Sequence, residues 1–143
     1  MGTRICLEAD PVSVGRARRF CASTLDEWGA AADLVATCVL LVSELSTNAV
    51  LHARSGFTVR MERSGGLRVE VDDDDPRLPH RRDYRVDAAS GRGMRMVTAL
   101  ARTSGAAPNG FGKTVWFELD WDGRPEVLSQ LDGGRPRRFT PPA

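Results

Sequence analysis

The sequence is poor in cysteine and in net charge, and each shortage excludes a class of protein. Its 143 residues include only three cysteines, Cys6, Cys21 and Cys38, an odd number without close spacing. Such a set supplies neither a disulfide framework nor a zinc site, so we expect reduced thiols and a cytoplasmic protein. Lysine and arginine total 20 against 19 acidic residues, and this net charge of +1 gives no electrostatic support to nucleic-acid binding.

The sequence also lacks the patterns of a secreted or membrane-inserted protein. Its N-terminus, MGTRICLEAD, has no basic segment followed by an apolar one, and we expect no window to approach the apolar length that crosses a bilayer. The hydrophobic fraction of 41% is ordinary for a globular protein. We therefore expect one compact domain over residues 1–122 and a disordered tail over 123–143, where Gly, Pro and Arg are frequent.

Hydrophobic periodicity predicts helices and strands in succession. Apolar residues alternate in three predicted strands and recur every three or four residues in two predicted helices, which are, in chain order, strand 3–9, helix 12–28, helix 32–53, strand 57–63 and strand 67–73. Ser64-Gly65-Gly66 predicts a hairpin between the last two strands. A third helix is expected from Gly91 to about Ser104-Gly105, followed by one or two strands, the last of them over 112–120.

Hairpin-paired strands with helices collected on one face make an α+β fold, a two-layer α/β sandwich with a mixed, mostly antiparallel sheet. Residues 74–90 carry neither helical nor strand periodicity. A loop of this length in a compact domain usually serves a function.

Three polar side chains, Glu44, Asn48 and His52, are spaced four residues apart in the second predicted helix. Positions four apart drift by about 40° around a helix, so the three form a slanted row beside the apolar face. Such a row is typical of the solvent boundary of an amphipathic helix. However, an Asn carbonyl oxygen also suits Mg²⁺, and a Glu one turn away can orient or deprotonate a hydroxyl. Spacing alone leaves both interpretations open.

Four consecutive aspartates, Asp72 to Asp75, end the predicted strand in VEVDDDDP. A run of like charges is usually a solvated loop. Asp73 differs because it stands where the strand ends, so its carboxylate can accept a hydrogen bond from an exocyclic amine such as that of adenine. A calcium site is disfavoured, since the spaced oxygen ligands and terminal Glu of a calcium loop are absent from the sequence.

Two glycine-containing motifs follow. In GRGM, Gly91 and Gly93 would let backbone amides approach a ligand, and the helix behind them would present its positive end to phosphate. Gly-x-Gly is also common in ordinary turns. GKTVWFEL contains Thr114 and Lys113, the only lysine in the chain.

Taken in order, ELSTNAVLH, VEVDDDDP, GRGM and GKTVWFEL resemble the motifs of the GHKL ATP-binding superfamily, which has the Bergerat or histidine-kinase-like ATPase fold. The branch that the chain resembles most is that of the anti-sigma-factor serine/threonine kinases. The similarity runs from about Val12 to Asp120. It implies that ATP and Mg²⁺ are the cofactors and that the second predicted helix is half core and half nucleotide site.

The resemblance implies a role for each residue that matches a motif. Asn48 would ligate Mg²⁺, Glu44 would act as base or orienting group on the attacking hydroxyl, and His52 would belong to the cofactor site. Asp73 would contact the adenine amine. Thr114 would support Asp73 and the adenine through hydrogen bonds.

The remaining matches concern the phosphates and the loop. Gly91, Gly93 and the adjacent Met94 would line the cofactor site on the phosphate side, and Lys113 would contribute beside Thr114. The loop over residues 74–90 would be the ATP lid.

The resemblance implies a partner-switching regulator, a protein serine/threonine kinase that phosphorylates a protein antagonist and can sequester a sigma factor. Dimers are common among such relatives, so a homodimer is compatible with it. One departure favours a degenerate, non-catalytic nucleotide- or protein-binding adaptor instead: the superfamily's first glycine box, Asp-x-Gly-x-Gly, here reads Asp73-Asp74-Asp75-Pro76-Arg77. Glu44 and Asn48 favour the kinase, because an adaptor has less need of them.

Overall fold

The computed structural model describes residues 1–53, 55–75 and 88–121, and of residues 88–93 it describes the backbone alone. The elements follow in the order β1 (Gly2–Glu8), α1 (Val12–Glu27), α2 (Ala32–His52), β2 (Gly56–Arg63), β3 (Leu67–Asp73), α4 (Ala88–Leu100), β4 (Thr103–Pro108) and β5 (Lys113–Leu119). Most of the expected lid, and the expected disordered tail over 123–143, lie outside the described residues.

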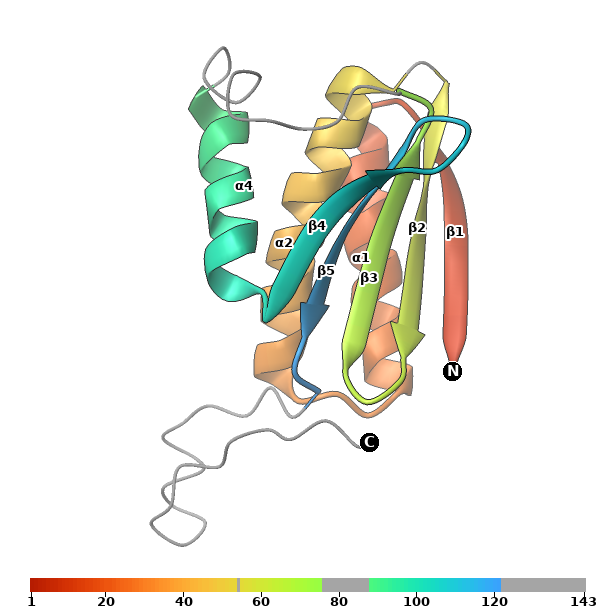
Figure 1. The fold of residues 1–143 in the computed structure, drawn as a ribbon. Coiled ribbons are helices and arrows are strands. Elements are labelled where there is room, and N and C mark those ends of the chain that lie inside the picture. Colours follow the sequence, from red (N-terminus) through yellow and green to blue (C-terminus); the bar gives the residue numbers. More distant parts are fainter. Residues whose placement is uncertain (54, 76–87, 122–143) are drawn as a thin grey trace, which may run out of the picture.

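The five strands form a single sheet in the order β1-β2-β3-β5-β4 (Figure 1). The helices α1, α2 and α4 cover one of its faces, so the predicted α+β two-layer sandwich is confirmed. The sheet is not mixed, however, because each of its four strand pairings is antiparallel. The chain leaves β3, crosses through α4 and turns at β4, which returns β5 antiparallel to β3.

The first helix ends as its sequence predicts. Gly29 adopts a φ of 78°, a left-handed conformation that favours glycine. The N–H of Ala30 donates to the carbonyl of Leu25 at 2.9 Å, and the N–H of Gly29 donates to that of Asp26 at 3.1 Å. These two bonds are those of a Schellman motif, which satisfies the last carbonyls of α1 and turns the chain toward α2.

The core lies between the helices and the inner face of the sheet. Alternate residues of the three central strands point into it, namely Phe57, Val59, Met61, Leu67, Val69, Val71, Val115, Phe117 and Leu119. From α2, the apolar arc predicted from the sequence is buried against them, and its members include Leu34, Cys38, Leu41 and Leu45. This burial fixes which face of α2 meets the sheet, and therefore which face carries the polar row.

Two boundaries differ from the sequence prediction. α4 begins at Ala88 rather than Gly91, and it ends at Leu100 rather than near Ser104-Gly105. The strand β4 occupies that second region instead. Its sequence, TSGAAP, has no apolar alternation, and it is a strand because it pairs with β5 along the sheet edge. Gly105 lies directly against Trp116, since an added Cβ would be 2.7 Å from the indole ring.

One described helix is long and apolar enough to cross a membrane by length and composition alone, namely α2. The expectation that no window approaches that length is therefore wrong. In this fold α2 is the central helix, and it packs against α1, α4 and the strands of the sheet. Core packing therefore accounts for its apolar character.

Candidate functional site

The polar row of α2 faces α4 rather than α1. Arg18 Nη1 of α1 donates to Ser43 Oγ at 2.8 Å, which marks the side of α2 that meets α1. At about 100° per residue, Glu44, Asn48 and His52 lie roughly 100°, 140° and 180° further around the helix. They therefore point to the side on which α4 packs against α2 (Figure 1).

The side chains of this row are available to a ligand. Glu44 and Asn48 are half-buried and His52 is exposed. Within the described part of the chain, none of the three side chains forms a hydrogen bond or an ion pair. A half-buried carboxylate and amide without protein partners can receive a cation or a donor without breaking an existing contact.

The side chains of the row fit a Mg²⁺ ion that takes most of its ligands from phosphates and waters. Residues 1–53, 55–75 and 88–121 contain no group of three or more His, Cys, Asp or Glu side chains that could hold a metal by themselves. Mg²⁺ binds through one or two protein oxygens when phosphates and waters supply the rest. The Asn48 amide oxygen, with the Glu44 carboxylate one turn away, matches that requirement.

The aspartate run is not a solvated loop, because each of its members has a fixed partner or is buried. Strand alternation turns Asp72 to the helix-free face, where the Thr114 hydroxyl donates to it and Arg60 Nε lies 2.8 Å from its Oδ2. Asp73 points to the helices and is 7% exposed. Lys113 Nζ lies 3.1 Å from its Oδ1 and 3.0 Å from its Oδ2.

The next two aspartates tie the end of β3 to its surroundings. Asp74 Oδ2 accepts hydrogen bonds from the backbone N–H and the hydroxyl of Ser55, at 3.0 and 2.6 Å. The N–H of Asp75 donates to Asp73 Oδ1 at 2.8 Å, and the carbonyl of Asp75 accepts from Lys113 Nζ at 3.3 Å. The Asp75 carboxylate is buried, with Oδ2 3.8 Å from the same ammonium.

The register between β3 and β5 corrects the role predicted for Thr114. Asp73 pairs with Lys113, and Asp72 pairs with Thr114. Because side chains alternate across a sheet, Thr114 contacts Asp72 on the helix-free face, which is open to solvent, and not Asp73 on the helix face. The residue that supports Asp73 is therefore Lys113, for which sequence reasoning gave no definite role.

Two further residues, to which the sequence analysis assigned no role, hold this end of the sheet together. An added Cβ on Gly112 would lie 2.1 Å from the Asp73 carbonyl oxygen, so the two backbones approach more closely than any side chain allows. Asn109 Oδ1 accepts from the N–H groups of Phe111 and Gly112, and its amide donates to the Thr114 hydroxyl. The Asn-Gly-Phe-Gly sequence is the local signal that marks this turn.

The glycines of GRGM lie inside α4 rather than before it. Since α4 begins at Ala88, Gly91 falls in its first turn and Gly93 in the second. From its fourth residue onward, each N–H of a helix donates to the carbonyl four residues earlier, so the amides of Gly91 and Gly93 are both committed within α4, and those of residues 88–90 are left to face a ligand. Met94 packs against the hydrophobic core.

The predicted site residues gather at one end of the sandwich. The C-terminal end of α2, the C-terminal end of β3 and the N-terminal end of α4 lie together there, beside the turn between β4 and β5 (Figure 1). This arrangement brings His52, Asp73, Lys113 and Gly91 to the same end, with Asn48 and Glu44 further along α2.

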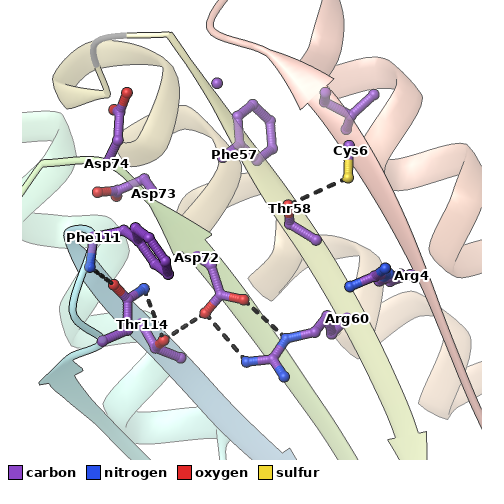
Figure 2. Close-up of a pocket in the computed structure, with 13 residues that line it drawn as sticks. Arg4, Cys6, Phe57, Thr58, Arg60, Asp72, Asp73, Asp74, Phe111 and Thr114 are labelled. Atoms are coloured by element: carbon purple, nitrogen blue, oxygen red, sulfur yellow. Dashed lines mark hydrogen bonds and ion pairs between the residues drawn. The ribbon is translucent and has the colours of Figure 1, made fainter.

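An open hollow lies on the helix-free face of the sheet. It is an open groove of about 630 Å³, lined among others by Arg4, Cys6, Arg60, Asp72 and Phe111 (Figure 2). No side chain of the α2 row lines it. The groove therefore excludes the α2 row, although Asp73 and Thr114 of the predicted nucleotide site are among its lining residues.

Alternating charges cover the rest of the helix-free face. The ion pairs run from Arg60 to Glu70 and Asp72, from Arg68 to Glu70 and Glu118, and from Arg102 to Glu118 and Asp120. Partial burial lowers the pKa of Arg60, but its hydrogen bond to Asp72 and the nearby carboxylates outweigh this and raise the pKa overall. All of these cations are at least one-third exposed, so water screens them.

The comparisons with known proteins point to one family. The sequence model of the histidine kinase-like ATPase domain matches residues 7–119. No curated protein sequence matches this chain. Among 14 matching chains of solved structures is one containing the RsbU and RsbW domains of Rv1364c from Mycobacterium tuberculosis. That match has a TM-score of 0.65 and 22% identity, and it covers 83% of this chain and 32% of the other, so it shows likeness of fold.

Proposed function

Because the chain belongs to the histidine kinase-like ATPase family, we propose that it binds ATP·Mg²⁺ and phosphorylates a serine or threonine of a protein antagonist. Capture of a sigma factor, a cytoplasmic location and a homodimer are further parts of this proposal. The observation that carries it is the α2 row. Glu44 and Asn48 have no partner among the described residues and lie on the side of α2 that meets α4.

The residues of the row divide the chemistry between them. Asn48 would hold Mg²⁺ through its amide oxygen, and the metal would neutralise charge on the phosphates. Glu44, one turn earlier on α2, would orient the incoming hydroxyl and accept its proton. The first amides of α4, those of residues 88–90, would face the phosphates. Positioning and charge stabilisation are the main requirements of phosphoryl transfer.

One observation favours the second candidate, a non-catalytic adaptor of the same fold. The carboxylate of Asp73 is already paired with Lys113, and Asp75 stands where the superfamily has its first box glycine. An adaptor would retain the sandwich for protein association without turnover. Nucleotide binding and ATP consumption separate the two candidates.

The proposal is tested by titrating the protein with ATP by calorimetry, with and without Mg²⁺. We expect micromolar binding that is strengthened by Mg²⁺, and we expect Asn48→Ala to remove that dependence because the amide oxygen is lost. Asp73→Asn should weaken binding with or without the metal. Glu44→Gln should retain binding and lower the rate of ATP consumption by about 10²–10⁴-fold, the usual contribution of a general base.

Thr47→Ala is the matched control, because Thr47 is exposed on α2 outside the row and bonds only the Ser43 carbonyl. It should change neither binding nor turnover. Absence of binding up to millimolar ATP in the unmodified protein would overturn the kinase proposal and leave the adaptor.

A further inference from the structure

The deepest charged contact among the described residues is the one between Asp73 and Lys113. Their side chains are 3% and 7% exposed, whereas the carboxylates of the open-face ion pairs are at least 20% exposed. Strand register places the two residues opposite each other on β3 and β5. The backbone contact at Gly112 keeps the strands in that position. The pair is therefore a rigid part of the sheet rather than a surface contact.

The pair retains one hydrogen-bond donor and one acceptor. The two oxygens of one carboxylate lie too close together to take two of the three tetrahedral N–H bonds of an ammonium. Lys113 therefore donates one N–H to Asp73 and one to the carbonyl of Asp75. Its third N–H has no acceptor within hydrogen-bond distance among the described residues, since the Asp75 carboxylate is 3.8 Å away. Asp73 Oδ1 accepts from Lys113 and from the N–H of Asp75, whereas Oδ2, within the described part of the chain, contacts only Lys113 and keeps a lone pair.

A donor beside an acceptor is the pattern that complements the edge of a purine. Adenine offers its N6 amine as donor and N1 as acceptor, and guanine offers O6 as acceptor and N1–H as donor. A carboxylate alone accepts from the adenine amine but faces guanine O6 as one acceptor against another. With an ammonium 3.0 Å away, O6 finds a donor and N1–H can reach the carboxylate.

We propose that Lys113 is a specificity-determining residue of the nucleotide site and that the Asp73–Lys113 pair accepts 6-oxopurine nucleotides as well as adenine nucleotides. This inference rests on the proposed function, because it takes Asp73 as the group that reads the base. A site that leaves a buried polar group unpaired rejects the wrong ligand by about 10⁴-fold or more. Lys113 removes that penalty for guanine and hypoxanthine.

The test compares ATP, GTP and ITP, each with Mg²⁺, by calorimetry on the unmodified full-length chain. ITP isolates the 6-oxo group because it lacks the 2-amino group of GTP. We expect dissociation constants for all three nucleotides within about tenfold of one another, since each base satisfies both Asp73 and Lys113. This comparison needs no variant and is independent of any folding defect.

Lys113→Met supplies the second measurement, because it keeps the length of the side chain and removes the donor. We expect it to weaken GTP and ITP at least tenfold relative to ATP. Arg102→Gln is the control, since it removes a cation that pairs with Glu118 and Asp120 away from the site. It should leave the ratio of the three affinities unchanged.

The possible failures are distinguishable. ATP binding with GTP and ITP more than 100-fold weaker in the unmodified protein would overturn the role of Lys113 and leave the proposed function intact. An equal effect of Lys113→Met on all three nucleotides would likewise assign Lys113 a structural role. Absence of binding by any nucleotide would overturn both proposals.

Discussion

Asp72 and Asp73 are adjacent on β3, yet they lie on opposite faces of the sheet and in different surroundings. Asp72 meets Arg60 and Thr114 on the helix-free face, beside an open groove (Figure 2). Asp73 meets Lys113 beneath the helices, where both side chains are nearly inaccessible to water. Arg60, by contrast, is 43% exposed.

This difference in burial decides how much each contact contributes to the stability of the fold. Water screens charges on the open face, and its ion pairs each contribute about 0–1 kcal/mol. On the helix face, folding has already removed water from both charged groups of the Asp73–Lys113 pair. Removing either group therefore leaves the other as a buried charge without a partner to compensate it. The alternation of a strand thus separates a solvated surface from a site in which a single polar group can decide binding.

The largest effect is expected from removing the buried cation. Lys113→Met leaves the carboxylates of Asp73 and Asp75 together without their ammonium. We expect it to lower the free energy of unfolding by about 3–5 kcal/mol, as for other broken buried pairs. The matched change on the open face, Arg60→Gln, should cost about 1 kcal/mol or less. Urea denaturation of both variants measures the difference.

Ionic strength should affect the two variants differently. Raising the ionic strength should diminish the small effect of Arg60→Gln and leave the effect of Lys113→Met nearly unchanged, because buried charges are screened far less. Equal losses in the two variants would show that the end of β3 is open to water, contrary to the burial of Asp73.

A second pair of residues, Phe117 and Trp116, compares the burial of the two faces with uncharged side chains. Phe117 is fully buried beneath the helices, and its neighbour Trp116 lies on the open face with Arg68 stacked 4.1 Å above its ring. Phe117→Ala should cost about 3–5 kcal/mol because it leaves a cavity in the core. Trp116→Ala removes a larger side chain but should cost only about 1 kcal/mol, mainly the cation–π contact. Thermal unfolding of both variants checks the order, and a larger loss for Trp116→Ala would contradict it.

The same alternation explains how far the sequence could predict this structure. The central strands and the helices α1 and α2 were predictable because their apolar periods are long and regular. β4 was not, since TSGAAP has no period and becomes a strand only by pairing with β5. The start of α4 was missed because Ala88-Ala89-Ser90 looked like the end of a loop.

The site was predictable to a similar extent. The helix period brought Glu44, Asn48 and His52 into one row, and the structure places that row beside α4. The partner of Asp73 was not predictable, because it depends on strand register. A shift of one residue would have given Asp73 the hydroxyl of Thr114 instead of the ammonium of Lys113.

The three cysteines extend the comparison of the two faces to thiol reactivity. Cys6 is exposed on β1, whereas Cys21 and Cys38 are buried between α1 and α2. A hydrogen bond with the Cys21 thiol, followed by burial, raises the pKa of Cys38 well above its ordinary range.

With an aromatic disulfide reagent near pH 8, we expect one fast thiol per native chain, which Cys6→Ser should remove. Cys38 should react at least about 10³-fold more slowly, because it must wait for opening of a core with a stability of about 5 kcal/mol or more. The raised pKa of Cys38 also makes the free energy of unfolding depend on pH. As the pH rises, the unfolded chain loses the Cys38 proton first, so this contribution to stability is fully present below the pKa of the unfolded thiol and declines above it. Fast reaction of two or three thiols in the native protein would show that the helix face is as open to solvent as the helix-free face, and the distinction between Asp72 and Asp73 would no longer hold.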